Sequence, residues 1–163
     1  SKTIEYWVRP GAGSIGSPTG GTKELMNKGG TVGLYWSNWR HALLASGVVS
    51  AQIYQSGGAI ITVNSTDLLT IDNWHHVAVT WDVSVSPRVM ELFIDGVSQG
   101  TGSSTIAPYD NPIIQPGLVF GHQISSTVDY FPGHFDGFRM SEGILYTADF
   151  DPPTAPPSTE FIV

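Results

Sequence analysis

Short segments in which apolar and polar residues alternate recur along this chain, and they constrain its fold more than any other feature. A period of two places successive side chains on opposite faces of a strand, so each segment predicts a strand with one buried face. The segments are TIEYWVR, ELMNKGG, VGLYW, SAQIYQ, AIITVN, WHHVAVTWD, RVMELFIDG, GLVFGH and GHFDGFRMS. They are rich in β-branched and aromatic residues and predict an all-β fold, a sandwich.

Glycine-rich sites between these segments mark where the chain reverses. Asp95–Gly96 and the QSGG stretch at 55–58 favour tight hairpin turns, because these residues tolerate positive φ. Two further glycine-rich stretches, residues 11–21 and 100–104, are small and polar, and we predict that they form loops at the rim. Residues 142–150 (EGILYTADF) predict one short helical turn, which the following prolines end.

The proline-rich end of the chain sets the predicted domain boundary. A length of 163 residues suits one domain that buries a continuous core. Prolines from residue 152 onward favour an extended, polyproline-like conformation with little packing. We therefore predict a sandwich over residues 1–151 and an extended tail or linker over 152–163.

Charge and composition exclude several classes of partner. Fourteen acidic residues against seven basic ones give a net charge of −7 without any basic run, so the backbone of a nucleic acid would be repelled. No apolar run approaches the ~18 residues of a membrane span. The sequence has no cysteine, which excludes disulfides and thiolate metal sites. We therefore expect neither nucleic-acid binding nor membrane insertion.

Two adjacent histidines in WHHVAVTWD raise the question of a metal site. On a strand, His75 shares a face with Val77, Val79 and Trp81, and this apolar set is predicted to face the core. His76 then lies on the opposite, more polar face. Two side chains that point apart cannot hold one ion from a regular strand, so we interpret both histidines as structural and hydrogen-bonded.

Several motifs, in a fixed order, resemble a known family. The segments TIEYWVRP, LMNKGG, WHHVAVTWD, LFIDGV, LVFGH and GHFDGFRMSEGILYTADFDPP are similar to the laminin-G-like (LamG) branch of the concanavalin A-like lectin/glucanase superfamily. The order is W-x-H-V-A, a strand ending in D-G, an apolar segment ending in Gly, G-x-x-D-x-x-R and F-x-P-P. The closing segment is also similar to the ends of such domains in phage tail and virion-surface proteins. The resemblance implies a jelly-roll sandwich of two antiparallel sheets, in a family whose members mostly bind glycans or proteins.

Some members of this superfamily are glycanases, but the sequence lacks their catalytic pattern. Retaining hydrolysis needs two carboxyl groups roughly 5–5.5 Å apart, which an E-x-D-x-x-E strand provides. No such pattern and no G-x-S-x-G elbow is present, and the five glutamates are scattered at Glu5, Glu24, Glu91, Glu142 and Glu160. We predict that the chain is not an enzyme.

The densest cluster of aromatic and polar residues is GLYWSNWRH at 33–41. Flat rings stack on sugar faces, and amides and guanidinium groups bind hydroxyls. The alternative is an ordinary strand in which Trp36 fills the sandwich and Trp39 covers an edge. The candidate ligand-binding residues are Tyr35, Trp36, Asn38, Trp39, Arg40 and His41.

Asp136 is the candidate metal ligand. The resemblance implies that the strand GHFDGFRMS carries an Asp that helps bind a structural Ca²⁺, together with main-chain carbonyls from early in the chain. Calcium accepts such a set of hard oxygen ligands. The alternative is that Asp136 pairs with Arg139 or accepts backbone N–H bonds at a strand end.

Two functions follow from these observations. The first is a non-catalytic module that recognises a cell-surface glycan or polysaccharide as part of a larger extracellular or virion-surface protein. The second is a structural module of a phage fibre, tail or capsid decoration, which would present its edges to neighbouring virion proteins or to copies of itself as a homo-oligomer.

Overall fold

The computed structural model describes residues 1–16, 21–29, 37–55, 60–107, 118–122 and 130–155, apart from the side chains of 29, 37 and 38. Sheet I has the strand order β10-β1-β6-β7-β8 and sheet II the order β5-β4-β3-β2-β9. The strands are β1 (Lys2–Pro10), β2 (Lys23–Gly29), β3 (Ser37–Leu43), β4 (Val48–Tyr54), β5 (Ile60–Leu68), β6 (His75–Asp82), β7 (Arg88–Ile94), β8 (Val97–Ser104), β9 (Leu118–Phe120) and β10 (Gly133–Glu142). All pairings are antiparallel, and the predicted two-sheet sandwich is confirmed.

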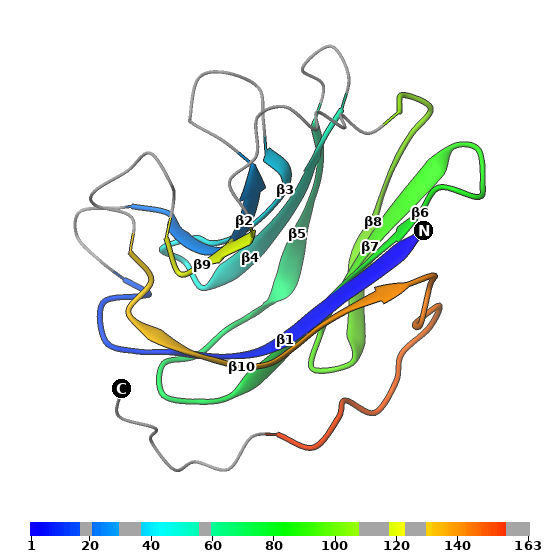
Figure 1. Ribbon diagram of the computed structural model, residues 1–163. Coiled ribbons are helices and arrows are strands. Elements are labelled where there is room, and N and C mark those ends of the chain that lie inside the picture. Colours follow the sequence, from blue (N-terminus) through cyan, green and yellow to red (C-terminus); the bar gives the residue numbers. More distant parts are fainter. Residues whose placement is uncertain (17–20, 30–36, 56–59, 108–117, 123–129, 156–163) are drawn as a thin grey trace.

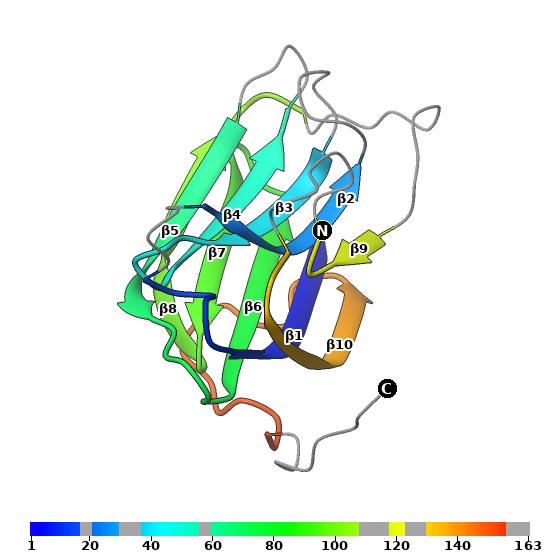
Figure 2. The same cartoon turned by 90° about the vertical axis from the view of Figure 1, so that its left-hand side faces the viewer.

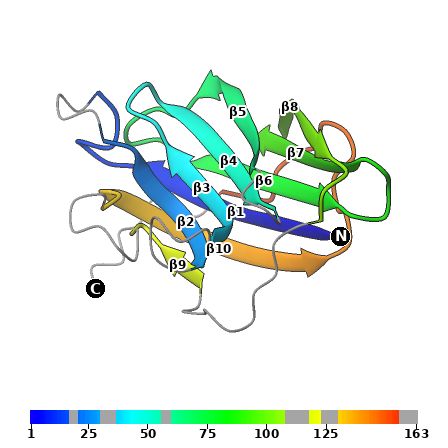
Figure 3. The same ribbon diagram turned by 90° about the horizontal axis from the view of Figure 1, so that it is seen from above.

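The two sheets pack face to face, and the core lies between them (Figures 1 and 3). Most strands contribute alternate residues to this core, as the period of two requires, whereas β2 contributes the adjacent Leu25 and Met26 where its register with β3 shifts. In β6 the predicted apolar set is buried, with Val77, Val79 and Trp81 at most 6% exposed. Sheet I supplies further core residues such as Tyr6 and Leu92, and sheet II supplies Leu25, Met26, Leu43, Val49, Ile53, Ile61 and Val63.

Strand β8 corrects one prediction, because residues 100–104 are not a loop. They pair with β7 from Leu92↔Gly100 to Arg88↔Ser104 and belong to the strand at one edge of sheet I. The glycine at 102 has a packing reason: a Cβ there would come within 2.6 Å of Ile61 Cγ2, on β5 of the other sheet. Small residues in this strand therefore permit a close approach of the two sheets.

The hairpin between β7 and β8 turns on Asp95–Gly96, as predicted. Asp95 has φ 51° and Gly96 φ 80°, the pair of positive angles that a tight two-residue hairpin requires. Strands β4 and β5 also pair as a hairpin, although its turn lies outside the described residues.

The chain after β10 covers part of the outer face of sheet I. This C-terminal segment, residues 143–155, is orange to red in Figure 1 and runs back along the sheet. Phe150 N donates to Gly96 O at 2.9 Å, and Ser98 N donates to Asp149 Oδ1 at 2.8 Å. The segment has bends and no helix, so the helical turn predicted at 142–150 is wrong.

The C-terminal segment also changes the environment predicted for His76. Its ring lies 5.8 Å from that of Phe150, and His76 is 1% exposed. The face opposite the core is therefore buried on β6, where Ala78 and Thr80 are at most 4% exposed. Sheet I is covered on both faces along this strand.

Candidate functional site

Strand β3 separates the residues of the predicted aromatic-polar cluster. Trp39 and His41 point into the core, where they are 9% and 2% exposed. Arg40, between them, points to the outer face of sheet II, because neighbouring residues on a strand alternate in direction. Tyr35 and Trp36 lie outside the described residues, as does the side chain of Asn38.

On the core side, Trp39 has no room beside it for a sugar. It lines a cavity of about 10 Å³ together with Lys2, His41 and Trp81, a space that holds one water at most. The Lys28 ammonium lies 5.2 Å from the centre of the Trp39 ring, at the distance of a cation–π contact. In the described structure, Trp39 therefore packs between the sheets.

His41 is held in the core by a hydrogen bond with Tyr6. Tyr6 Oη lies 3.1 Å from His41 Nδ1, and the two rings stack with centroids 5.8 Å apart. Burial lowers the pKa of His41 to about 3 and raises the pKa of Tyr6 above its usual range. Both groups are therefore neutral near pH 7, and neither faces solvent.

On the outer face of sheet II, Arg40 forms a buried ion pair. Its Nε donates to Glu24 Oε1 at 2.8 Å and to Oε2 at 3.1 Å, while Nη2 donates to Oε1. Nη1 donates to Gln52 Oε1 at 3.2 Å. The Glu24 side chain is fully buried and that of Arg40 is 22% exposed. Removal of either partner would leave an uncompensated charge, so the pair is a fixed feature of this face.

A polar row crosses sheet II through Arg40. Asn27 pairs with Arg40, Arg40 with Gln52, and Gln52 with Thr62, one residue from each of four adjacent strands. Strands lie about 4.7–4.9 Å apart, so the row spans roughly 14 Å. Figure 2 shows these strands side by side in one layer.

Exposure along this outer face falls from β5 to β2. On β5, Ile60, Thr62 and Asn64 are exposed, whereas the core-facing Ile61 and Val63 are 5% exposed. Gln52 and Tyr54 on β4 are half-buried. Tyr54 pairs with Ile60 and provides an aromatic ring two residues from Gln52, at the open side of the face. Hydroxyl, amide, guanidinium and aromatic groups thus share one surface.

Sequence reasoning missed four of these residues, namely Gln52, Tyr54, Thr62 and Asn64. The signal was present, because SAQIYQ and AIITVN alternate and their polar positions must share the face opposite the core. What the sequence does not contain is the pairing of β3, β4 and β5, which brings these positions into register with Arg40.

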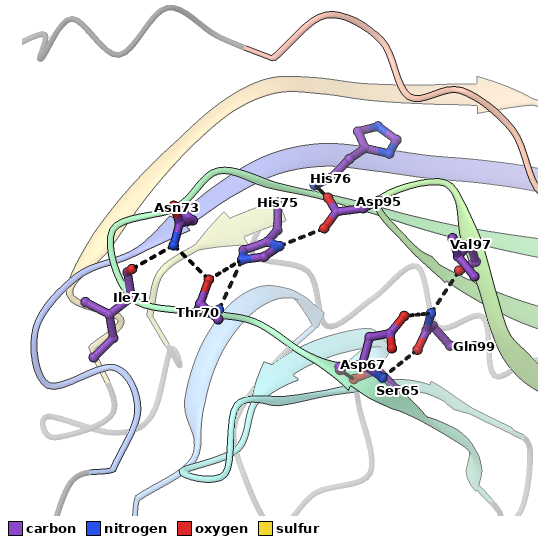
Figure 4. Close-up of polar contacts among 10 residues, drawn as sticks. All are labelled: Ser65, Asp67, Thr70, Ile71, Asn73, His75, His76, Asp95, Val97 and Gln99. Carbon is purple, nitrogen blue, oxygen red and sulfur yellow. Dashed lines mark hydrogen bonds and ion pairs between the residues drawn. The ribbon is translucent and has the colours of Figure 1, made fainter.

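A second polar constellation, at the start of β6, resembles a catalytic relay (Figure 4). His75 Nδ1 lies 2.8 Å from Asp95 Oδ2, and His75 Nε2 lies 3.0 Å from Thr70 Oγ1. However, the backbone N–H of Thr70 also donates to Nε2 at 3.0 Å. That bond occupies the lone pair that a general base would use. The constellation fixes the turn between β5 and β6.

Asp95 also has a structural role, because it fixes the position of a turn. Its Oδ1 accepts a 2.7 Å hydrogen bond from the backbone N–H of His76, and its Oδ2 meets the His75 ring. Burial raises the pKa of Asp95, but the hydrogen bonds from His75 and His76 outweigh this, and the pKa lies below its usual value. The ionised carboxylate therefore ties the β7–β8 turn to β6.

A third network joins the neighbouring edges of the two sheets, and Figure 4 shows its contacts among Asp67, Val97 and Gln99. Gln99 Oε1 on β8 accepts hydrogen bonds from Thr66 N and Asp67 N on β5, at 3.0 and 2.8 Å. Gln99 Nε2 donates to Asp67 Oδ2 at 2.8 Å. One glutamine thus closes this side of the sandwich.

A fourth cluster lies beneath the C-terminal segment. Glu5, 3% exposed, accepts hydrogen bonds from Arg139 Nε and, at 2.5 Å, from Tyr146 Oη. His76 Nε2 lies 3.5 Å from Glu5 Oε2, and burial lowers the pKa of His76. The Glu5 carboxylate and the His76 ring are buried although Arg139 is about half exposed, so a soluble substrate does not reach the carboxylate or the imidazole.

Asp136, the predicted metal ligand, lies exposed on β10. Its Oδ1 accepts a 2.6 Å hydrogen bond from Gly137 N, while Arg139 pairs with Glu5. Within the described ranges, no group of three or more His, Asp or Glu side chains is placed to hold an ion. Asp136 thus supplies a single carboxylate, and a calcium ion would need most of its ligands from elsewhere. The calcium site stays a prediction, which metal analysis would test.

The chain belongs to the concanavalin A-like lectin/glucanases superfamily, because the model of that family matches residues 1–149. A search of curated protein sequences gave no match. The part of the chain that the structure describes contains no helix long and apolar enough to cross a membrane.

Solved structures with low sequence identity share the fold. The CBM40 domain of Ruminococcus gnavus IT-sialidase bound to α2,3-sialyllactose is 12% identical, with a TM-score of 0.66 over 90% of this chain and 77% of that one. The same domain bound to α2,6-sialyllactose gives 12% identity and a TM-score of 0.56, over 90% and 78%. The heptameric SAP-like pentraxin from Limulus polyphemus is 11% identical, with a TM-score of 0.55, over 85% and 62%.

Proposed function

We propose that the chain is a non-catalytic glycan-binding module that binds its ligand on the outer face of sheet II. The observation that carries this proposal is the polar row through Arg40 and Gln52, which lies beside the Tyr54 ring on an exposed sheet face. The opposite outer face, on sheet I, is partly covered by residues 143–155. The structural similarity to a domain solved with sialyllactose supports a sugar as the ligand class.

The chemistry of the face suits sugar hydroxyls. Gln52, Asn64 and Thr62 offer donors and acceptors, and Tyr54 offers a ring with an apolar surface. Arg40, fixed by Glu24, holds the Gln52 amide in place from the neighbouring strand, so less side-chain entropy is lost when a ligand binds. A place outside the cell or on a virion surface is part of this proposal, since such glycans lie there.

The proposal is tested on a glycan array followed by calorimetry with the best ligand. We expect Tyr54→Ala to weaken binding by about 1–2 kcal/mol, or roughly fivefold to thirtyfold, because a stacked ring is lost. Gln52→Ala should weaken it by about 1 kcal/mol.

The matched control is Thr101→Ala, an exposed position on β8 of the other sheet, which should leave the affinity unchanged. Turnover assays with laminarin and lichenan are expected to release no product. Equal affinity of wild type, Tyr54→Ala and Gln52→Ala would show that the ligand does not bind on the outer face of sheet II. Release of product in the turnover assays would refute the proposal that the chain is non-catalytic.

One observation favours the alternative of an assembly module. Strand β10 lies at the end of sheet I and carries Phe138 and Met140, which are each 40% exposed. An edge strand presents backbone N–H and C=O groups that a second chain or a neighbouring virion protein can pair with.

A further inference from the structure

We infer that the outer face of sheet II selects neutral glycans and discriminates against acidic sugars such as sialates, uronates and sulfated residues. This inference rests on the proposed function and specifies its ligand class. It follows from the ion pair in which Glu24 neutralises Arg40, the single arginine of this face.

The Arg40 guanidinium already binds a carboxylate of the protein, Glu24, with the Nε–Nη2 edge that could otherwise bind a ligand carboxylate. An arginine binds a ligand carboxylate best with two parallel N–H groups, as a fork. In this structure the Nε–Nη2 edge meets both oxygens of Glu24, with Nε at 2.8 and 3.1 Å. The third nitrogen, Nη1, donates to Gln52. A sugar carboxylate would therefore compete with Glu24 for the same edge.

The ion pair between Glu24 and Arg40 cannot be broken at low cost. Its side chain is fully buried, so separation from Arg40 would leave a charged carboxylate without water or a counter-ion. Arg40, in contrast, is partly exposed. The pair therefore presents a net charge of zero, with a guanidinium that acts as scaffold for the Gln52 amide.

No other part of the chain brings a second fixed cation to this face. All seven Lys and Arg residues of the sequence lie within the described ranges. Lys23 and Lys28 on β2 pair with Leu43 and Trp39, on the side that faces sheet I. Four others lie on strands of sheet I and contact groups on that sheet or in the turns beside it, namely Lys2, Arg9, Arg88 and Arg139.

The electrostatic potential of the whole chain also disfavours acidic sugars. The chain carries a net charge of −7, so an anionic sugar approaches against a negative potential while a neutral one does not. The remaining side chains of the row and its neighbours, Gln52, Tyr54, Thr62 and Asn64, are uncharged at neutral pH. They match hydroxyl groups and offer no compensation for a carboxylate.

The experiment compares paired glycans that differ only in their charge. The probes are lactose with α2,3-sialyllactose, and methyl-esterified with de-esterified oligogalacturonates, together with neutral glucan, xylan and mannan fragments on the same array. We expect binding among the neutral probes, with the acidic member of a pair bound at least about tenfold more weakly. Tighter binding of the acidic members would overturn the inference and leave glycan binding intact. Binding of no probe would refute the proposed function as well.

Two variants test the cause of the selectivity. Glu24→Gln keeps the shape but releases the charge of Arg40, so the acidic-to-neutral affinity ratio should rise by roughly tenfold. Because Glu24 is buried, Gln52→Lys serves as a second variant that adds an unpaired cation at a partly exposed position and should raise the same ratio.

The control is Thr101→Lys, which adds the same charge on β8 and should leave the ratio within about twofold of the wild type. Thermal melting establishes that each variant is folded. An unchanged ratio in folded Glu24→Gln and Gln52→Lys would show that charge balance at Arg40 does not set the ligand class.

Discussion

His41 carries a titratable ring into the core, and this ties the stability of the protein to pH. In the unfolded chain the ring takes up a proton near pH 6.5, but in the folded protein it does so only near pH 3. The contribution of His41 to stability is therefore fully present above pH 6.5 and is lost as the pH falls from 6.5 towards 3. His76, whose pKa burial also lowers, acts in the same direction.

We predict that acidification from pH 7 to pH 5 lowers the free energy of unfolding by about 2 kcal/mol through His41 alone, since each pKa unit is worth about 1.4 kcal/mol. Urea unfolding at both pH values measures this change. His41→Gln keeps a polar partner for Tyr6 but does not titrate, so its stability should change less between the two pH values. An equal loss in wild type and variant would mean that His41 is protonated in the folded state.

The contrast between Trp39 and Arg40 shows which part of a site the sequence can predict. Neighbouring residues of a regular strand point to opposite faces, so the six candidate residues of GLYWSNWRH could not all line one binding surface from such a strand. The sequence does not decide which alternate set is buried. That depends on the sheet opposite, where His41 meets Tyr6 of β1.

At the scale of elements, strong alternation of apolar and polar residues predicted strands correctly, and turn-forming residues predicted the Asp95–Gly96 turn. Segments with few apolar residues were predicted wrongly. The positive φ angles of Asp95 and Gly96 follow from their residue types. Strand β8, VSQGTGSS, has few side chains to bury, and its strand conformation comes from pairing with β7 and a close approach to β5. The C-terminal segment likewise has no periodicity and is placed by contacts with sheet I.

Phe150 is the main apolar anchor of the C-terminal segment. Its ring stacks on Tyr146 at 3.5 Å between centroids and lies 5.5 Å from the ring of Phe93. We predict that Phe150→Ala lowers the free energy of unfolding by about 1–2 kcal/mol and the melting temperature by roughly 2–8 °C. It should also expose His76 and raise the pKa of its ring towards the usual value, which NMR titration would follow.

The control for this prediction lies in the same segment. Leu145 is 44% exposed, so Leu145→Ala should change stability by no more than about 0.5 kcal/mol. If Phe150→Ala melted like the wild type and left the His76 titration unchanged, the segment would not be held on sheet I in solution.

At the scale of the whole molecule, the contacts between the edges of the two sheets differ on the two sides of the sandwich. Strands β5 and β8 are joined by Gln99 and by the contact at Gly102. On the other side the three-residue β9 faces the ten-residue β10, with Phe120 and Phe138 rings 4.9 Å apart. The sequence predicted the sandwich but not this asymmetry, because edge positions depend on strand order.

The open edge at β10 decides between a glycan-binding monomer and an assembly module. Natural edge strands avoid pairing through bulges and charges, and β10 has both. Its register with β1 shifts between Glu5 and Trp7, Gly137 has φ 58°, and Arg139 and Glu142 lie on the strand. We therefore predict a monomer of 17.5 kDa by light scattering at micromolar concentration. A species of twice that mass, reduced to the monomer by Phe138→Lys but not by Val85→Lys, a similarly exposed position outside β10, would instead identify β10 as an assembly edge.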